Sequence, residues 1–212
     1  MELIFSEYFT ELIAVISITM LTIITPGPDF IIVARNSLAY SRRSGVMTAA
    51  GVATAVWIHV AYTLAGIGLI LSQSIFLYSL IKYLGAAYLI YLGVSCVKGA
   101  GNSVSVEAQK SSQSITSFRS YQMGFLNNAL NPKATVFFVS LFTQLVSTTT
   151  PLSVQIIYGA IVSISCFVWF SCVAMFLNTQ GIRRFFLKIQ KHIERVMGGV
   201  LIAVGLKVAS SS

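Results

Sequence analysis

Residues 25–29, with the sequence TPGPD, interrupt the first long apolar stretch of the chain. Residues 131–133, with the sequence NPK, interrupt the fourth in the same way. Proline breaks the regular helix at both places, and Asp29 and Lys133 put charged side chains there. Broken helix at membrane depth is tolerated only where the backbone lines a cavity or is buried in protein. Two breaks at corresponding positions of two halves are typical of the binding site of a secondary transporter.

The composition is that of an integral membrane protein. Of the 212 residues, 56% are apolar and only 9% are charged, a balance that soluble domains of this size do not have. The net charge of +8 would suit a nucleic-acid partner, but the basic residues are confined to a few connections between apolar runs. That distribution is typical of orientation in a membrane, so we expect no nucleic-acid partner.

Two further features of the composition exclude other classes. The three cysteines lie in apolar segments and form no C-x-x-C pair, which argues against a thiol-electron carrier. The N-terminus carries Glu2, Glu7 and Glu11 and no basic residue, so a cleaved signal peptide is not expected.

Six apolar stretches are long enough, or nearly so, to cross the hydrocarbon layer as helices. They are residues 8–34, 46–71, 80–97, 120–146, 152–177 and 194–209. The last is short, and its glycines would permit close contact with another helix. We therefore expect an all-α membrane protein with six transmembrane helices, of which the first and the fourth are broken by proline.

Basic residues predict the orientation of these helices. Lys and Arg gather near residues 35–45, 98–119 and 178–194, whereas the connections at 72–79 and 147–151 contain none. Because basic connections stay on the cytoplasmic side, both termini should lie outside.

Three crossings in each half make the second half an inverted copy of the first. Weak sequence similarities support a duplication, among them Gly51 with Gly159 and Pro26 with Pro132. The predicted organisation is a 3+3 inverted repeat, with a first three-helix repeat at 1–98, a cytoplasmic linker at 99–118 and a second three-helix repeat at 119–212.

Asp29 has two interpretations. A helix rising about 1.5 Å per residue reaches Thr25 roughly 20 Å from Glu11, so Asp29 is deep in the membrane, where a carboxylate is costly. Asp29 is either an acid that caps the helix restarting after Pro28, or a ligand for a substrate ammonium and a candidate for proton coupling.

Lys133 is harder to explain as a structural residue. Asn131 is a favourable N-cap and Pro132 suits the first helical position, so a helix should restart at Asn131. Lys133 then lies in the first turn, where a cation is disfavoured. Either it extends to a membrane surface, or it meets a carboxylate, which would be Asp29, a substrate, or each in turn.

The restarted helices would themselves bind a zwitterion, because their free N–H groups suit a carboxylate and unwound carbonyl groups suit an ammonium. His59 is either a proton relay or a hydrogen-bonded residue between helices. Asn127 and Asn128 either line the cavity or satisfy local backbone. No metal or cofactor is expected. The predicted substrate-binding residues are Pro26, Gly27, Pro28, Asp29, Asn128, Asn131, Pro132 and Lys133.

With these residues in view, the chain resembles the LysE/RhtB family of amino acid exporters over essentially its whole length. The resemblance rests on residues 26–30 (PGPDF), the Arg43–Gly45–Gly51 run, residues 85–93 (GAAYLIYLG), and residues 124–126 (GFL) leading to 131–134 (NPKA). It implies export of amino acids across the bacterial inner membrane, driven by the ion gradient rather than by ATP. Within the family, the chain looks most like the threonine and homoserine branch. Thr143 departs from the pattern, which often has proline there, and leaves the shape of that part of segment four open.

The leading hypothesis is a proton-motive-force-driven exporter of small neutral amino acids, of the threonine, homoserine or homoserine lactone type. The alternatives are an exporter of branched-chain or basic amino acids, or a passive small-solute channel, although a channel filter usually needs a ring of like residues from several subunits. An enzyme is not expected, because no G-x-S-x-G, H-E-x-x-H or Walker-type stretch occurs. The expected partners are the amino acid, protons and the lipid bilayer, and a homo-oligomer is left open.

The charges of the predicted site favour a neutral substrate. Asp29 and Lys133 sum to zero if they are the only deep charges, and every other acidic residue is expected at a terminus, in a loop or at a helix end. A lysine substrate would need a further acid to meet its side chain. The resemblance points the same way, because the basic-amino-acid branch typically has Gln where Asp29 stands, Asn where Lys133 stands, and an extra acid in segment two.

Overall fold

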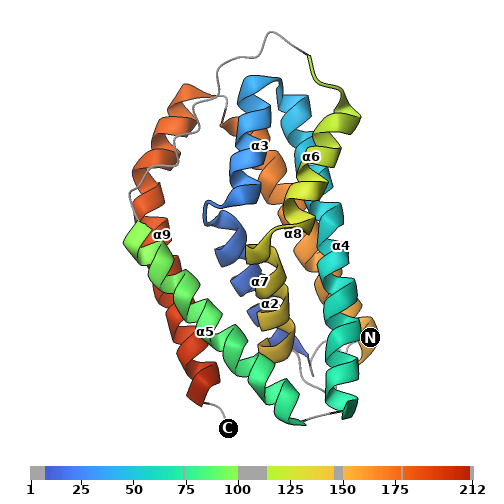
Figure 1. The fold of residues 1–212 in the computed structure, drawn as a ribbon. Helices are drawn as coiled ribbons and strands as arrows, with labels where there is room; N and C mark the ends of the chain where they lie inside the picture. The colour runs from blue at the N-terminus through green and yellow to red at the C-terminus, as the bar shows by residue number, and fades with distance from the viewer. Residues whose placement is uncertain (1–7, 74, 100–113, 146–149, 178, 211–212) are drawn as a thin grey trace.

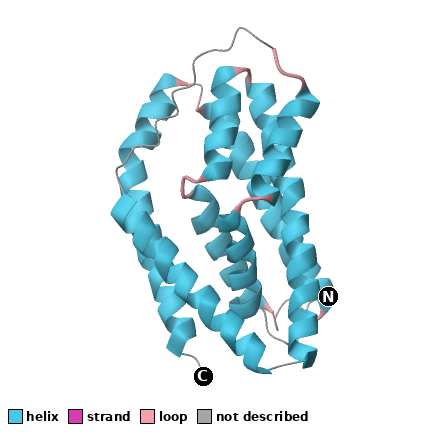
Figure 2. Ribbon diagram, in the orientation of Figure 1, coloured by secondary structure: helices cyan, strands magenta, loops and turns pink. Residues whose placement is uncertain are grey.

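The computed structural model describes residues 8–73, 75–99, 114–145, 150–177 and 179–210, and every regular element in these ranges is a helix (Figures 1 and 2). The predicted all-α architecture is therefore confirmed for the described residues. The helices are, in chain order, α2 (Phe9–Ile24), α3 (Pro28–Ala39), α4 (Arg42–Gln73), α5 (Ile75–Gly99), α6 (Ser117–Ala129), α7 (Pro132–Leu145), α8 (Leu152–Phe176) and α9 (Gln180–Ser210).

Both predicted helix breaks are present. α2 and α3 are separated by Thr25, Pro26 and Gly27 and meet at an angle of 54°. α6 and α7 are separated by Leu130 and Asn131. A new helix begins after each break, at Pro28 and at Pro132. Proline is tolerated at a first helical position because the N–H that it lacks would make no intrahelical hydrogen bond there.

Length and composition mark the spans that could cross a membrane. Arg42–Gly66 of α4 and Leu152–Phe176 of α8 each qualify among the described residues, and α2 with α3 qualifies as one broken span. Shorter apolar helices lie at Tyr83–Lys98 and Pro132–Phe142.

Glycines bring two pairs of helices into close contact. A Cβ atom on Gly51 of α4 would collide with the backbone oxygen of Tyr121 on α6, and one on Gly124 of α6 would collide with that of Thr48. α5 and α9 meet in the same way, because a Cβ on Gly93 would lie only 2.6 Å from the oxygen of Gly198. The predicted contact through the glycines of the last segment is therefore confirmed. In a membrane, the hydrophobic effect does not drive helices together, because lipid is itself apolar. Small residues compensate by allowing the helix backbones to pack closely.

The buried apolar core is shared by α2, α3, α4, α7 and α8, and the α5–α9 pair lies beside it (Figure 1). Some of its side chains are completely or almost completely inaccessible, for example Val15, Val33, Val56 and Phe138. The two breaks lie about halfway along the bundle (Figure 2), where polar backbone must find partners inside the protein.

Several predicted bounds were wrong. The last helix begins at Gln180 rather than 194, because Lys, Arg, Gln and Leu favour helix well beyond the apolar part that hydropathy detects. The connection predicted at 72–79 is mostly helical, since α4 reaches Gln73 and α5 begins at Ile75. The connection at 35–45 is also mostly helical, with α3 ending at Ala39 and α4 beginning at Arg42. Most of the predicted linker, residues 100–113, lies outside the described residues.

Candidate functional site

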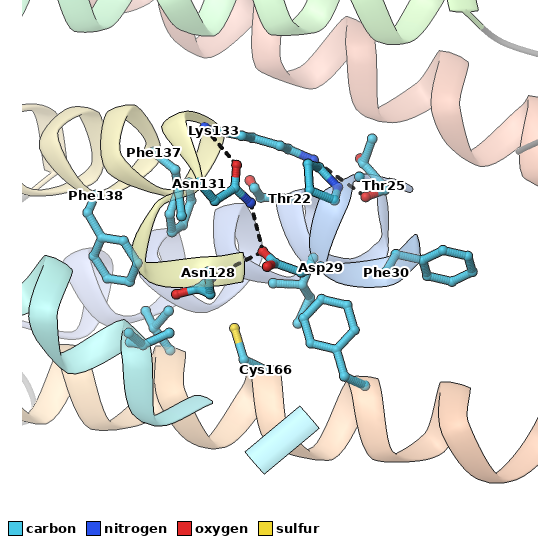
Figure 3. A pocket seen from close by; sticks show the side chains of 17 residues that line it. Thr22, Thr25, Asp29, Phe30, Asn128, Asn131, Lys133, Phe137, Phe138 and Cys166 are labelled. Carbon is cyan, nitrogen blue, oxygen red and sulfur yellow. Dashed lines mark hydrogen bonds between the residues drawn. The ribbon is translucent and has the colours of Figure 1, made fainter. Parts of the chain in front are cut away.

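A cavity of about 50 Å³ lies where the two breaks meet (Figure 3). α2 and α3 form one side of it, α6 and α7 another, and α4 and α8 complete the wall. Its polar lining includes Thr22, Thr25, Asp29, Asn128, Asn131 and Lys133. Its apolar lining includes Ile23, Phe30, Val56, Ala134, Phe137, Phe138, Val162, Cys166 and Phe170.

Most of the predicted site residues meet here. The cavity is lined by six of the eight, namely Gly27, Pro28, Asp29, Asn128, Asn131 and Lys133. Pro132 instead lines an open groove of about 450 Å³ between α3 and α6, which also contacts Pro28, Asn127 and Asn131. Pro26 lies in the first break but lines neither space.

Asp29 is held by three amide groups, two from the last turn of α6 and one from the second break. Its Oδ1 accepts a hydrogen bond from Asn127 at 2.8 Å, and its Oδ2 accepts from Asn128 at 3.1 Å and from Asn131 at 3.0 Å. Hydrogen bonds to an ionised group are stronger than those between neutral groups. Asp29 is not the N-cap of α3, because Gly27 occupies that position without a side-chain hydrogen bond, but it does lie in the first turn, where the helix dipole favours an acid.

Asn131 serves both breaks. Its Oδ1 accepts a hydrogen bond from the backbone N–H of Lys133 at 3.0 Å, which confirms the predicted cap of α7. Its Nδ2 donates to Asp29. One side chain therefore ends the irregular backbone of the second break and fixes the carboxylate of the first.

Lys133 lies across the first break. Its Nζ is 3.4 Å from the backbone oxygen of Thr25, and a Cβ on Gly27 would lie 3.1 Å from that Nζ. The ammonium is thus directed into the protein, so extension to a membrane surface was the wrong interpretation (Figure 3). Among the described residues, its hydrogen-bond partner is this carbonyl group rather than Asp29.

Within the part of the chain that the structure describes, two buried polar atoms at the cavity have no hydrogen-bond partner, Asn128 Oδ1 and Thr22 Oγ1. Leaving a buried acceptor unsatisfied costs free energy, so these atoms are placed to receive a donor from a bound molecule or water. Asn128 offers an acceptor, and the Thr22 hydroxyl can donate or accept. The sequence did not indicate Thr22, because α2 is apolar around most of its circumference.

His59 is a hydrogen-bonded residue between helices. Its side chain is fully buried, with Nε2 3.0 Å from the backbone oxygen of Asn128 and Nδ1 2.7 Å from the hydroxyl of Tyr62. Its ring stacks on Phe138 at a centroid distance of 5.4 Å. Both ring nitrogens therefore have hydrogen-bond partners. The bond to the backbone oxygen of Asn128 supports the end of α6, next to the second break.

One premise of the charge argument was wrong. Glu194 was expected at a helix end, but it lies well inside α9 and is only 6% exposed. The prediction failed because the start of α9 was placed at residue 194. Asp29 and Lys133 are therefore not the only charged side chains removed from the surface, and the sum of zero holds only for the described residues that line the cavity.

Comparison with known proteins gives a consistent assignment. The chain is 26% identical to the threonine efflux protein of Escherichia coli (strain K12), over 94% of this chain and 97% of that protein. It is 29% identical to the uncharacterized membrane protein YrhP of Bacillus subtilis (strain 168), over 95% of this chain and 99% of that protein. It is also 29% identical to the leucine efflux protein of Salmonella choleraesuis (strain SC-B67), over 68% of this chain and 66% of that protein.

No solved structure matches the chain. Residues 20–212 match the model of the LysE type translocator family. The match covers nearly the whole chain, including both helix breaks and every residue around the cavity. The chain therefore belongs to the LysE type translocator family, as a multi-pass membrane protein that transports rather than transforms its substrate.

Proposed function

We propose that this protein exports small neutral amino acids, of the threonine, homoserine or homoserine lactone type, across a bacterial inner membrane in exchange for protons. The observation that carries this proposal is the cavity between the breaks, where an amide-bound carboxylate, an inward-directed ammonium and two unsatisfied polar atoms lie together. The threonine efflux relative, which matches over nearly its whole length, supports an amino acid as substrate.

The proposed framework is six crossings arranged as an inverted repeat, with 1–98 and 119–212 as the two units. In this framework α2 with α3 corresponds to α6 with α7, since the chain of each pair is interrupted just before a proline. α2 begins and α9 ends toward the same end of the bundle (Figure 1), which agrees with an even number of crossings. We place that end outside, because the basic residues gather in the opposite connections.

The zwitterion has matching groups in this cavity. Its ammonium would donate to Asn128 Oδ1 and approach Asp29, which lines the same cavity. Its carboxylate would accept from the ammonium of Lys133 near the first turns of α3 and α7, where the helix dipoles favour an anion. During transport the ammonium of Lys133 would thus exchange the Thr25 carbonyl group for the substrate carboxylate. Asp29 is the candidate to carry the proton.

Export by reconstituted protein tests this function. Liposomes containing the protein would be loaded with labelled threonine, homoserine, leucine or lysine, and an acidic exterior would drive exchange. We expect saturable threonine or homoserine efflux that an uncoupler abolishes, and at least about tenfold less lysine efflux, because an unpaired charge is costly in the cavity. Linear, uncoupler-insensitive flux would favour a channel, and preferred lysine efflux would overturn the neutral class.

A leucine-type exporter is the second candidate. The side chains of Phe137, Phe138, Val162 and Phe170 line much of the cavity, which suits an apolar substrate side chain. The leucine efflux relative is 29% identical to this chain over about two thirds of each protein. Preference for leucine over threonine in the same liposomes would select this candidate.

A further inference from the structure

A group of polar side chains joins α2 to α8 at the end of the bundle where both helices begin. The carboxylate of Glu11, in the first turn of α2, accepts hydrogen bonds from the Thr150 hydroxyl at 3.0 and 3.1 Å and from the Tyr158 hydroxyl at 3.1 Å. Thr150 is only 4% exposed and Tyr158 only 2%. The side chain of Gln155 fixes Thr150 further by donating to its backbone oxygen at 2.7 Å.

This polar group is separated from the cavity by packed side chains. Thr22 of α2 lines the cavity, and eleven residues of helix place it about 16 Å from Glu11. Val15, Ile18 and Thr19 lie between them and are at most 7% exposed. The cavity is therefore closed toward this end by α2 packed on α8.

Hydrogen bonds are a suitable means of holding helices that must separate. Apolar side chains of similar size would join α2 and α8 at least as firmly as a carboxylate with its donors. Unlike an apolar contact, however, these hydroxyl groups and the carboxylate regain hydrogen bonds from water when the helices part. The closed and open arrangements can then differ by a small free energy, as alternation between them requires.

We propose that Glu11, Thr150 and Tyr158 form the outer gate of the transport pathway, whose opening releases the amino acid on the side where α2 begins. This proposal rests on the proposed export function. The hydrogen bonds hold α2 against α8 while the cavity is loaded from the opposite side, and they break when the substrate leaves.

The chain contains a cysteine that can report this opening. Cys166 of α8 lines the cavity with only 5% of its surface exposed, and its sulfur points toward Asn128 and Asp29 (Figure 3). In a background with Cys96→Ser and Cys172→Ser, labelling of Cys166 by a membrane-impermeant thiol reagent would measure access to the cavity. Right-side-out and inside-out vesicles would distinguish the two directions without requiring transport.

Tyr158→Phe and Glu11→Gln each remove part of the gate and should accelerate labelling from the side where α2 begins. We expect about a tenfold increase or more, because one hydrogen bond to a charged group corresponds to roughly ten- to hundredfold in an equilibrium constant. Tyr121→Phe is the matched control, since it removes a tyrosine hydroxyl bonded at 2.8 Å to Thr54, between α4 and α6.

Three outcomes would overturn the gate. Labelling could stay unchanged in Tyr158→Phe and Glu11→Gln protein that keeps its elution profile and thermal stability, it could rise from the opposite side only, or Tyr121→Phe could raise it equally. Thr150→Val provides a third gate variant if Glu11→Gln does not accumulate. The two proposals can fail separately. If the parent protein does not export amino acids from liposomes but the gate variants still label faster, the export function is wrong and the gate is retained.

Discussion

The two helix breaks surround one cavity, yet they are built differently. Three residues separate α2 from α3, and the last of them, Gly27, is the N-cap of α3 and has no side chain to cap it. Two residues separate α6 from α7, and Asn131 caps α7 with its own side chain. The carboxylate of Asp29 lies just after the first break, and the three amide donors that hold it lie at the second break or in the turn of α6 before it.

This difference shows that the two breaks are complementary rather than equivalent. A charge at the first break is stabilised by neutral dipoles of the second, although an opposite charge lies at the same cavity. Lys133 instead contacts the Thr25 carbonyl through one long hydrogen bond of 3.4 Å, an arrangement that a substrate carboxylate can replace at little cost. Because Asp29 and Lys133 are each bonded to neutral groups rather than to one another, both can interact with a zwitterion.

The largest effect is expected from Asp29→Asn. The substitution keeps the shape of the side chain but replaces one acceptor oxygen by an NH₂ group, which must face amide donors from the second break. Because each hydrogen bond to a charged group contributes about 1.5–3 kcal/mol, we expect export to fall by at least about tenfold. The measurement is uncoupler-sensitive efflux per unit of membrane-inserted protein.

Asp29→Glu is the control for charge without position. It keeps the carboxylate and moves it by one methylene, so partial export would show that charge itself is required. Normal efflux by Asp29→Asn at normal abundance would mean that the first break needs only a hydrogen-bonded polar group.

The next effect is expected from Lys133→Gln. The variant retains a polar side chain in the first turn of α7 but cannot attract a substrate carboxylate by charge. We expect about a tenfold rise in the substrate concentration for half-maximal efflux, consistent with loss of one charge-assisted contact, and little change in abundance. Lys133→Arg is the matched control that keeps the charge. A reduced maximal rate with unchanged half-saturation would contradict this binding role and assign Lys133 to the conformational change.

The sequence predicted those features of the site that depend on local rules. Proline positions located both breaks, and the Asn-Pro pair predicted the cap of α7, because capping involves residues two or three positions apart. The hydrogen bonds from the three asparagines to Asp29 were not predicted. They join residues about a hundred positions apart, so they depend on how two distant helices are placed.

Other features had no usable sequence signal. α8 is apolar on all sides, and an evenly apolar helix has no periodicity to show that Cys166 faces a cavity. Glu194 was misplaced because hydropathy detects only the apolar part of α9. The bounds of buried apolar helices were predicted more reliably than those of helices that continue into polar sequence.

Asn131 allows its two roles at the second break to be separated. Asn131→Ser should retain an N-cap, since serine caps about as well as asparagine, but it removes the donor to Asp29. Asn131→Ala removes both and should lose a further 0.5–2 kcal/mol of stability, roughly the value of a cap. We expect export to fall about fivefold in both variants, and thermal stability, measured on purified protein, to fall further in Asn131→Ala than in Asn131→Ser. Equal export by Asn131→Ser and the parent would show that two amide donors suffice.

The smallest effect is expected from Gly27→Ala. Gly27 has φ −157° and ψ −171°, an extended conformation that alanine adopts without strain, so the fold should be preserved. The new methyl group would lie 3.1 Å from Lys133 Nζ and 3.5 Å from its Cδ, which requires a flexible side chain to move by a few tenths of an ångström. We expect roughly a twofold change in half-saturation and no loss of abundance, within the range typical of mild substitutions. Gly51→Ala is the contrasting control, because its methyl group would collide with backbone of α6 that cannot move aside.

A double-mutant cycle connects this substitution to Lys133. In a Lys133→Ala background no long side chain crosses the first break, so Gly27→Ala should have no further effect on half-saturation. If the two effects were additive instead, Gly27→Ala would be acting through the backbone of the first break, and the position of Lys133 across that break would not determine substrate binding. Non-additivity would show that the side chain of Lys133, just after the second break, extends across the first break to bind the substrate. No side chain of the first break has the corresponding role, and this asymmetry distinguishes the two regions.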